Sequence, residues 1–381
     1  MDTLVIGCWN RAVVLCGQFW RCLLKWCYLT CWIPTVKKHR PDALRPGKWG
    51  KHRYVEVHNR QLHYVESGSS SQPLMLFLHD LSDFWYGWRH QVAEFSGDYW
   101  TVAVDLPGWG QSDELATAGS QPYTVDHLAS YVTGLLDALG KRHCVLVGHG
   151  FGALIGWHLI RQHPDRVSKY VMMSLPPLGV LQELHRCGAI PLRVHLKALL
   201  LCTPGLSTIL AGAELAERLF AHFVQPADLE AYRYAFSQPG SVAQALRVFR
   251  NTLVHFLQQK YERDSHKVAP SPGLFLVGDS LQGVPLAHYR NLLHHQSLDV
   301  QLVRRTGWFL PQEDPETVNR LMRKFLNIKV PPVIEVVRKE LCIDCASAPI
   351  PEHRHARSCA QNCDGEEHWE MRYKVRLPIH S

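Results

Sequence analysis

The segment Cys144–Gly152, CVLVGHGFG, decides the fold. It opens with a short β-rich run, Cys144–Gly148, and an amphipathic stretch, Ala153–Gln162, follows it directly. At the junction, Gly148 and Gly152 place small residues on both sides of Gly150. A sharp turn from a strand into a helix needs such small flanks, because its backbone is tight and its centre is strained. We therefore predict a strand–turn–helix elbow centred on Gly150.

The same alternation of strand and helix extends from Arg53 to about Lys329. It predicts an α/β fold with a mostly parallel, doubly wound sheet. The β-rich runs stop between residues 175 and about 266, where we expect a helical cap inserted after the sixth strand, over the carboxyl ends of the strands. The predicted strands are Leu74–His79, Trp100–Asp105, Cys144–Gly148, Tyr170–Met173, Leu274–Val277 and Val300–Val303. The predicted helices outside the cap are Trp85–Phe95, Val125–Leu139, Ala153–Gln162 and Glu316–Phe325.

Composition excludes several classes of protein. The net charge of the 381 residues is +7, without a Lys/Arg stripe interleaved with aromatic residues, so we expect no nucleic-acid partner. Of the twelve cysteines, five precede residue 32 and four follow residue 341. A disulfide-stapled secreted domain would spread its cysteines through the core, so this distribution favours a reducing compartment. We expect no cofactor.

Residues 1–36 are predicted to associate with a membrane. They are rich in Trp, Leu, Val and Cys, but Arg11, Arg21 and Lys25 interrupt the apolar run. Most polar residues fall on one helical arc, which is typical of a cationic amphipathic helix lying in a membrane interface. A spanning helix, a helix packed on its own domain and a targeting peptide remain alternatives. The basic linker 37–52 favours a domain that faces the cytoplasm, with the endoplasmic reticulum among the candidate membranes.

The last segment, 330–381, follows the predicted domain 53–329 and is polar and aperiodic, so we expect it to be largely disordered. It carries two cysteine pairs, which are Cys342 with Cys345 and Cys359 with Cys363. Four such soft ligands are able to hold a tetrahedral zinc ion, but the second pair has an uncommon gap and tail cysteines are often simply solvated. Both interpretations stay open.

Four motifs stand in order along the chain, at His79–Arg89, Asp105–Asp113, Val147–Gly152 and Phe236–Gly240. Together they resemble the epoxide hydrolase family of the α/β-hydrolase fold, especially its membrane-anchored members. His79–Arg89, HDLSDFWYGWR, is similar to the family's H-G-x-P-E-x-W-x-x-W-R, and Asp105–Asp113, DLPGWGQSD, to its D-x-R-G-Y-G-x-S-D. Val147–Gly152 stands where the family has V-G-H-D-W-G, and Phe236–Gly240, FSQPG, lies in the predicted cap. The resemblance implies a hydrolase fold over Arg53–Lys329.

The resemblance also implies a catalytic triad, and its three positions hold unreactive residues. In the family, an elbow Asp attacks the epoxide, and a His with an acid partner activates the water that hydrolyses the ester. Gly150 stands in the nucleophile's place, Leu281 in the acid's and Gly307 in the base's. Asp279, two residues before Leu281, is a carboxylate that is able to substitute for the acid. We therefore predict a catalytically inactive hydrolase fold.

The accessory groups depart from the family as well. Phe249 stands where one cap tyrosine protonates the epoxide oxygen in the family, and residues 171–231 contain no Tyr to supply the other. Asp80 and Ser82 alter the H-G-x-P turn. We expect the pocket to be formed by His79, Asp80, His149, Phe151, Phe249 and Trp308.

Two alternative sites remain open at this stage. His79, Asp80, Asp105 and His149 all follow predicted strands, and together they are able to bind a metal or to act as acid and base. Gly148–Ala153 also fits the dinucleotide pattern G-x-G-x-x-A, although the hydrolase motifs explain its glycines.

Three functions follow from these interpretations. The leading prediction is a silent fold that binds a lipid-like ligand or a protein partner at a membrane. The alternatives are an active epoxide or ester hydrolase with a non-standard site, and a structural membrane adaptor.

Overall fold

The computed structural model describes residues 39–114, 124–192, 213–238, 241–258, 271–279, 284–293, 297–328, 333–337 and 372–376. The N-terminal segment 1–36, Leu281 and the four tail cysteines lie outside the described residues, so the predictions for them stay predictions. Contacts divide the chain into two units, Met1–Phe325 and Leu326–Ser381.

The first unit is built on one eight-stranded sheet with the order β1-β2-β4-β3-β5-β6-β7-β8. Along this order, every pair of adjacent strands from β4 onward is parallel. Strand β2 runs antiparallel to both of its neighbours, β1 and β4. The mostly parallel sheet is therefore confirmed. The strands are β1 (Lys51–Val57), β2 (Arg60–Ser67), β3 (Leu74–Leu78), β4 (Trp100–Val104), β5 (Cys144–His149), β6 (Val167–Met173), β7 (Gly273–Gly278) and β8 (Leu298–Val303).

The hairpin of β1 and β2 was not predicted from the sequence. Its connection consists of His58 and Asn59, which both have positive φ angles, of 51° and 59°. Two such residues form the tight turn that suits a right-handed twist between strands. Most residues of β1 are exposed or half-buried, so this edge strand lacks the continuous apolar run that marks a central strand.

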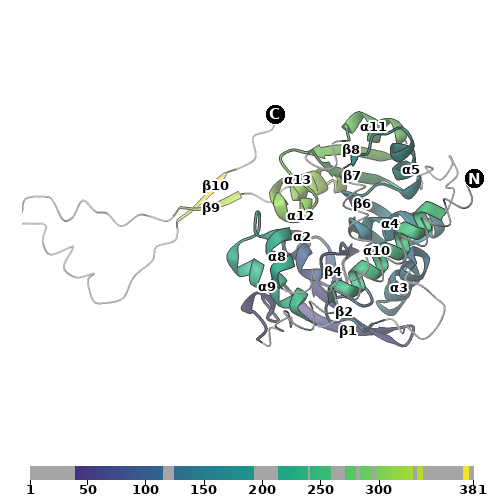
Figure 1. The fold of residues 1–381 in the computed structure, drawn as a ribbon. Helices are drawn as coiled ribbons and strands as arrows, with labels where there is room; N and C mark the ends of the chain where they lie inside the picture. The colour runs from purple at the N-terminus through teal and green to yellow at the C-terminus, as the bar shows by residue number, and fades with distance from the viewer. Residues whose placement is uncertain are drawn as a thin grey trace, which may run out of the picture. The chain divides into compact units, whose positions relative to one another are not determined.

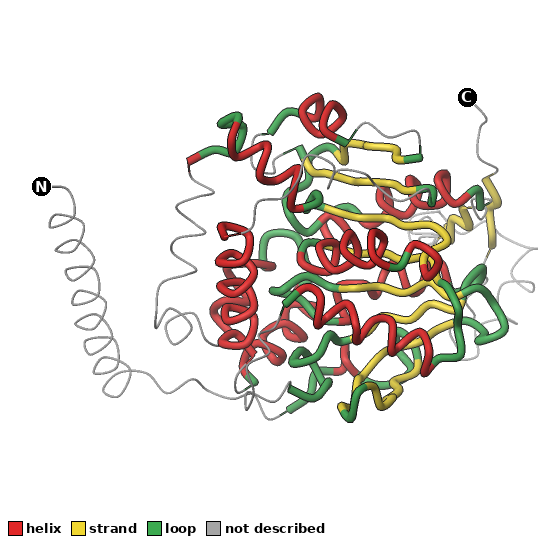
Figure 2. The backbone as a smooth tube through the Cα atoms, turned by 90° about the vertical axis from the view of Figure 1, so that its right-hand side faces the viewer, coloured by secondary structure: helices red, strands yellow, loops and turns green. Residues whose placement is uncertain are grey.

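Helices cover both faces of the sheet (Figures 1 and 2). The strands β3, β4, β5 and β7 are buried along their whole length, as expected for strands that lie between two helical layers. The elements outside the cap are η1 (Asp42–Leu44), η2 (Trp85–Trp88), α2 (Arg89–Phe95), α3 (Val125–Ala138), α4 (Phe151–Gln162), η3 (Pro164–Arg166), α11 (Leu286–Leu292), α12 (Leu310–Glu313) and α13 (Pro315–Leu326).

The segment between β6 and β7 forms the cap. Its described helices are α5 (Leu178–Arg186), α8 (Ala213–Phe220), α9 (Pro226–Ser237) and α10 (Ser241–Gln258). The helical insertion after the sixth strand is thus confirmed. None of the described helices is both long and apolar enough to cross a membrane.

The second unit contains one described feature, an antiparallel pair of β9 (Val333–Val337) and β10 (Arg372–Arg376). This pair is regular structure inside a segment that we predicted to be largely disordered. The remainder of the segment lies outside the described residues.

Candidate functional site

The elbow forms where the sequence places it. Gly150 links β5 to α4 with φ 54° and ψ −115°, a backbone conformation that residues with a side chain adopt only under strain. A Cβ atom at Gly152 would lie 2.2 Å from the carbonyl oxygen of Leu78, and one at Gly148 would lie 2.7 Å from that of Gly152. Small residues are therefore required on both sides of the turn.

The carboxylate of Asp80 fills the space next to the elbow. Leu78 of β3 pairs with Gly148 of β5 in parallel register, so the residues two further along, Asp80 and Gly150, lie side by side. A Cβ atom built on Gly150 would lie 2.0 Å from Oδ1 of Asp80. The side chain of an elbow nucleophile would therefore occupy the place that Asp80 holds.

Three donors fix the Asp80 carboxylate. Oδ1 accepts a 2.8 Å hydrogen bond from the backbone N–H of Phe151, the first residue of α4. Oδ2 accepts hydrogen bonds from Trp308 Nε1 and from the Ser82 hydroxyl, both of 3.0 Å. The positive end of a helix dipole also favours a negative charge at this point. The backbone N–H after the elbow, which serves as an oxyanion donor in hydrolases of this fold, is thus already bonded to an internal anion.

His149 connects the elbow to the segment that follows β8. Its Nε2 lies 2.6 Å from the carbonyl oxygen of Trp308, which only accepts, so Nε2 carries the proton. The hydroxyl of Ser174 donates to the same carbonyl at 2.7 Å. Burial lowers the pKa of His149, although the Asp80 carboxylate opposes this shift. His149 is therefore a neutral group that holds Trp308 in place.

His79 and Asp105 are engaged with the backbone. Nδ1 of His79 donates to the carbonyl of Asp80, and its Nε2 accepts from the N–H of Leu106. Burial lowers the pKa of His79. Asp105 accepts from the N–H groups of Trp85 and Gln111.

The metal alternative therefore finds no support in the part of the chain that the structure describes. No group of three His, Cys, Asp or Glu side chains there is able to hold a metal ion. The dinucleotide alternative is disfavoured as well, because a phosphate at the start of α4 would meet the Asp80 carboxylate.

Gly307, predicted to stand at the base position, leaves little room for a side chain. A Cβ atom at Gly307 would lie 3.1 Å from Oε1 of Glu313, a tight contact with the end of a flexible side chain. Glu313 accepts hydrogen bonds from the N–H groups of Gly307 and Phe309. Asp279, the alternative acid, is exposed, and Phe249 is half-buried on α10.

A buried polar network near the site was missed by the sequence analysis. Asp83 accepts hydrogen bonds from Gln312 Nε2 at 2.8 Å and from the Tyr232 hydroxyl at 3.2 Å. Arg89 contacts Gln312 and forms an ion pair with Asp228 of α9 at 3.0 Å. Burial raises the pKa of Asp83 to about 8, although hydrogen bonds from Phe84 N–H and Tyr232 oppose this shift. The network joins residues up to 229 positions apart, so no local sequence pattern reveals it.

Comparison with known proteins assigns the family. Residues 73–297 match the α/β-hydrolase fold family. The chain is 30% identical over 308 residues to Epoxide hydrolase 4 of Homo sapiens, a match that covers 76% of this chain and 83% of the relative. The chain belongs to the epoxide hydrolase family of α/β-hydrolases. The alignment with Epoxide hydrolase 3 of Mus musculus has 29% identity and covers 75% and 82% of the two chains.

Solved structures of epoxide hydrolases share the fold. The Bacillus megaterium epoxide hydrolase in complex with an inhibitor superposes with a TM-score of 0.65 at 26% identity, over 72% of this chain and all of that one. The epoxide hydrolase VrEH1 of Vigna radiata gives a TM-score of 0.62 at 23% identity and covers 74% of this chain and 99% of its own. Within this epoxide hydrolase fold, the chain carries glycine at the elbow centre.

Proposed function

We propose that this protein is a catalytically silent member of the epoxide hydrolase family, which binds a lipid-like ligand or a protein partner at a membrane. The observation that carries the proposal is the Asp80 carboxylate, which lies where an elbow side chain would be. An elbow nucleophile and Asp80 cannot both occupy this space. Asp80 also takes the Phe151 N–H, the donor that would stabilise a developing oxyanion.

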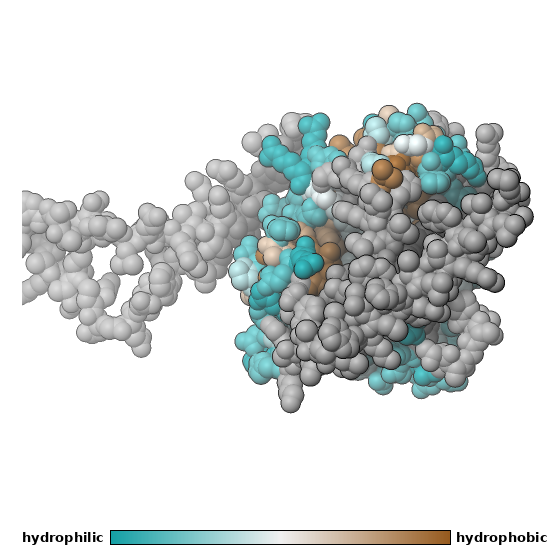
Figure 3. All heavy atoms as spheres, in the orientation of Figure 1, coloured by the Kyte–Doolittle hydropathy of each residue, from teal (hydrophilic) through white to brown (hydrophobic). Residues whose placement is uncertain are grey.

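The surroundings of the site are rich in aromatic side chains. Phe309, next to Trp308, lies 4.7 Å from Phe220 and 5.6 Å from Phe223, measured between ring centroids. Phe220 stacks on Tyr232 at 3.9 Å and contacts Phe236 of α9. Figure 3 shows apolar side chains reaching the surface among hydrophilic ones in the region of α8 and α9. Such an aromatic cluster beside a few polar groups is typical of a site for apolar ligands. A lipid that co-purifies would favour this function over that of a purely structural membrane adaptor.

We expect the purified protein to hydrolyse neither epoxides nor p-nitrophenyl esters above background between about pH 5 and pH 9, where a His base or a perturbed carboxylate would act. Product formation measured by mass spectrometry tests this expectation. The Asp80→Asn variant is the control, because it keeps the side-chain volume and removes the carboxylate. Turnover by the unmutated protein would contradict the proposal.

One observation favours a second candidate, an active hydrolase in which Asp80 itself is the nucleophile. Its carboxylate lies beside the elbow and touches the donor at the start of α4. However, both of its oxygens are hydrogen-bonded, which reduces their nucleophilicity. Turnover that is lost in Asp80→Asn, together with an ester trapped on Asp80 in a peptide digest, would establish this candidate instead.

The membrane part of the proposal rests on residues 1–36 and the basic linker 37–52. We expect deletion of residues 1–36 to move the protein from the membrane fraction to the soluble fraction, because the amphipathic segment supplies the apolar contact with the bilayer. Fractionation after a high-salt wash measures this. A truncated protein that stays with the membranes would show that another part of the chain is the anchor.

A further inference from the structure

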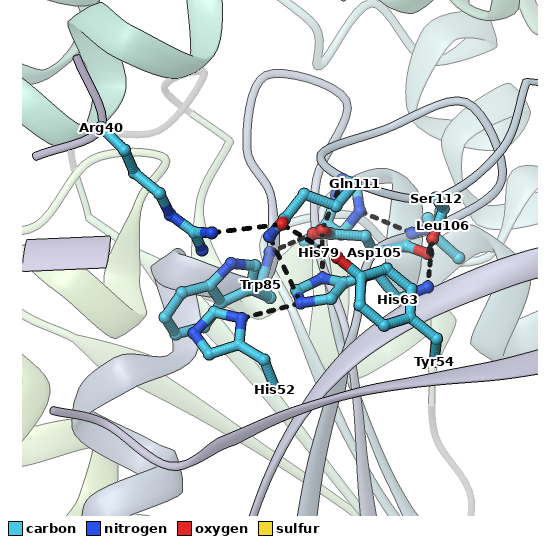
Figure 4. Close-up of polar contacts among 10 residues, drawn as sticks. All are labelled: Arg40, His52, Tyr54, His63, His79, Trp85, Asp105, Leu106, Gln111 and Ser112. Carbon is cyan, nitrogen blue, oxygen red and sulfur yellow. Dashed lines mark hydrogen bonds and ion pairs between the residues drawn. The ribbon is translucent and has the colours of Figure 1, made fainter. Parts of the chain in front are cut away.

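A chain of hydrogen bonds leads from a buried carboxylate to the surface at the edge strand β1. Nδ1 of His63 lies 2.8 Å from Oδ2 of Asp105, and both side chains are fully buried. Nε2 of His63 lies 2.8 Å from Nδ1 of His52 on β1 (Figure 4). The two imidazole rings are within 30° of coplanar and their centroids are 5.0 Å apart, as expected for rings bonded end to end. Face-to-face stacking brings rings closer, as in the 3.9 Å pair of Phe220 and Tyr232.

The proton positions in this chain follow from Asp105. As a carboxylate, Asp105 only accepts, so Nδ1 of His63 carries a proton. Burial alone would raise the pKa of Asp105, but the hydrogen bond and the charge interaction with His63 lower it below its ordinary value. Nε2 of Gln111, which only donates, lies 3.3 Å from Nε2 of His63, so Nε2 of His63 accepts and Nδ1 of His52 carries the proton between the two rings. A proton that is added at Nε2 of His52 therefore makes that ring a cation whose Nδ1–H group already points along the hydrogen bond to His63.

Two donors converge on one exposed acceptor beside His52. The Arg40 guanidinium and the Tyr54 hydroxyl both donate to Oε1 of Gln111, at 3.4 Å and 3.1 Å (Figure 4). Tyr54 is 49% exposed, and the Gln111 side chain is exposed as well. The carboxamide oxygen of Gln111 carries no charge, whereas an oxyanion would add charge attraction to its hydrogen bonds with the guanidinium and could accept two of them at once. An anionic oxygen at this point would therefore bind more strongly than Gln111 does.

The charges around His52 favour an anion at this surface. The groups that act on His52 are His63 of β2, Arg40 and the buried Asp105. Burial, His63 and Arg40 together lower the pKa of His52 to about 4, so its ring is neutral near pH 7. A bound anion would offset the repulsion by Arg40 and stabilise the protonated ring.

We propose that Arg40, Tyr54 and His52 form a binding site for a tetrahedral oxyanion of the phosphate class, and that its occupation draws a proton onto the His52–His63–Asp105 chain. Two sources share this chemistry, an anionic lipid headgroup and a free phosphate. The site lies where the basic linker 37–52 meets β1, away from the elbow, so the proposal does not depend on catalytic silence.

The test uses the full-length protein in a neutral detergent and inorganic sulfate, whose charge is constant over the pH range. Calorimetry in two buffers of different ionisation enthalpy gives both the affinity and the number of protons taken up. We expect proton uptake to be largest at about pH 5. This pH lies between the pKa of about 4 for His52 in the protein and the ordinary histidine pKa of 6.5.

Two variants distinguish a specific sulfate site from general electrostatic attraction of anions to a basic surface. We expect Arg40→Gln to weaken sulfate binding by at least about tenfold, because a charge-assisted contact is lost. Arg53→Gln is the matched control, since Arg53 lies on the same strand as His52 but pairs with Glu66, and its substitution should leave the affinity unchanged. His52→Gln should abolish the proton uptake. Equal weakening by Arg40→Gln and Arg53→Gln would overturn the proposal, as would sulfate binding by the unmutated protein without proton uptake.

Vesicles distinguish the two sources. If the ligand is a lipid headgroup, Arg40→Gln should bind less than Arg53→Gln to phosphatidylcholine vesicles that contain phosphatidic acid, and both should bind equally to pure phosphatidylcholine. If the ligand is a free anion, both variants should bind equally to the two kinds of vesicle, while the difference in sulfate affinity persists. Either pattern supports the site, and loss of the sulfate difference contradicts it.

Discussion

Replacing Gly150 by Asp should destabilise the protein by about 3 kcal/mol or more, because the new side chain collides with Asp80 in a strained turn. Its Cβ atom alone would lie 2.0 Å from Oδ1 of Asp80. The φ of 54° adds backbone strain, and two buried carboxylates in contact oppose each other's ionisation. Chemical unfolding at pH 7 measures the loss.

The second substitution Asp80→Gly should recover much of that loss. The carboxylate introduced at the elbow would then have room, and the Phe151 N–H would be available to it. We expect the double variant to be at least about 1.5 kcal/mol more stable than the sum of the two single effects, as is found for residues in direct contact.

Two controls divide the effect of Gly150→Asp into its causes. Gly150→Ala introduces the collision without the charge. Gly140→Asp introduces an Asp at a φ of 67° with no heavy atom within 4 Å of the new Cβ, so it reports backbone strain alone. If Gly150→Asp is no worse than Gly140→Asp, Asp80 does not block the elbow. The nucleophile position would then be free.

Asp228→Ala should lower the free energy of unfolding by a similar amount, roughly 3–5 kcal/mol, because it leaves the buried Arg89 guanidinium without its ion-pair partner. The Tyr86 hydroxyl, which donates to Asp228 at 2.6 Å, would lose its acceptor too. The free energy of unfolding from denaturant titration measures the change. Glu183→Ala removes an ion pair with Arg186 on the exposed surface of α5 and should change stability by less than about 0.5 kcal/mol. A loss below about 1 kcal/mol for Asp228→Ala would show that water replaces the missing carboxylate.

The elbow and the central strands could be predicted because their signals are local. The run CVLVGHGFG encodes a buried strand, a tight turn and a helix start within nine residues. The β1–β2 hairpin was missed because an edge strand has few apolar residues, and because His58 and Asn59 are not the Asn-Gly pair that usually marks such a turn.

The role of Asp80 could be predicted only in part. The sequence places Asp80 and Gly150 just beyond the ends of two strands, which suggests that they approach each other. It does not say that β3 and β5 are neighbours, nor that their register sets Leu78 opposite Gly148. The Trp308 contact spans 228 positions and depends on the path of the chain after β8. Such contacts depend on how distant segments pack together, whereas a sequence motif gives only the types of the residues.

The network of Asp83, Arg89, Asp228, Tyr232 and Gln312 has a kinetic consequence. It connects α9 of the cap to α2, to α12 and to the segment before η2. Lifting α9 would expose the buried Arg89 guanidinium and separate Asp228 from its two donors, Arg89 and Tyr86, so we expect opening to be costly. A molecule beneath the cap would leave only when this network breaks, whatever its own affinity for the aromatic side chains. Residence time, rather than the equilibrium constant, would then decide which occupant the protein carries through its lifetime in the cell.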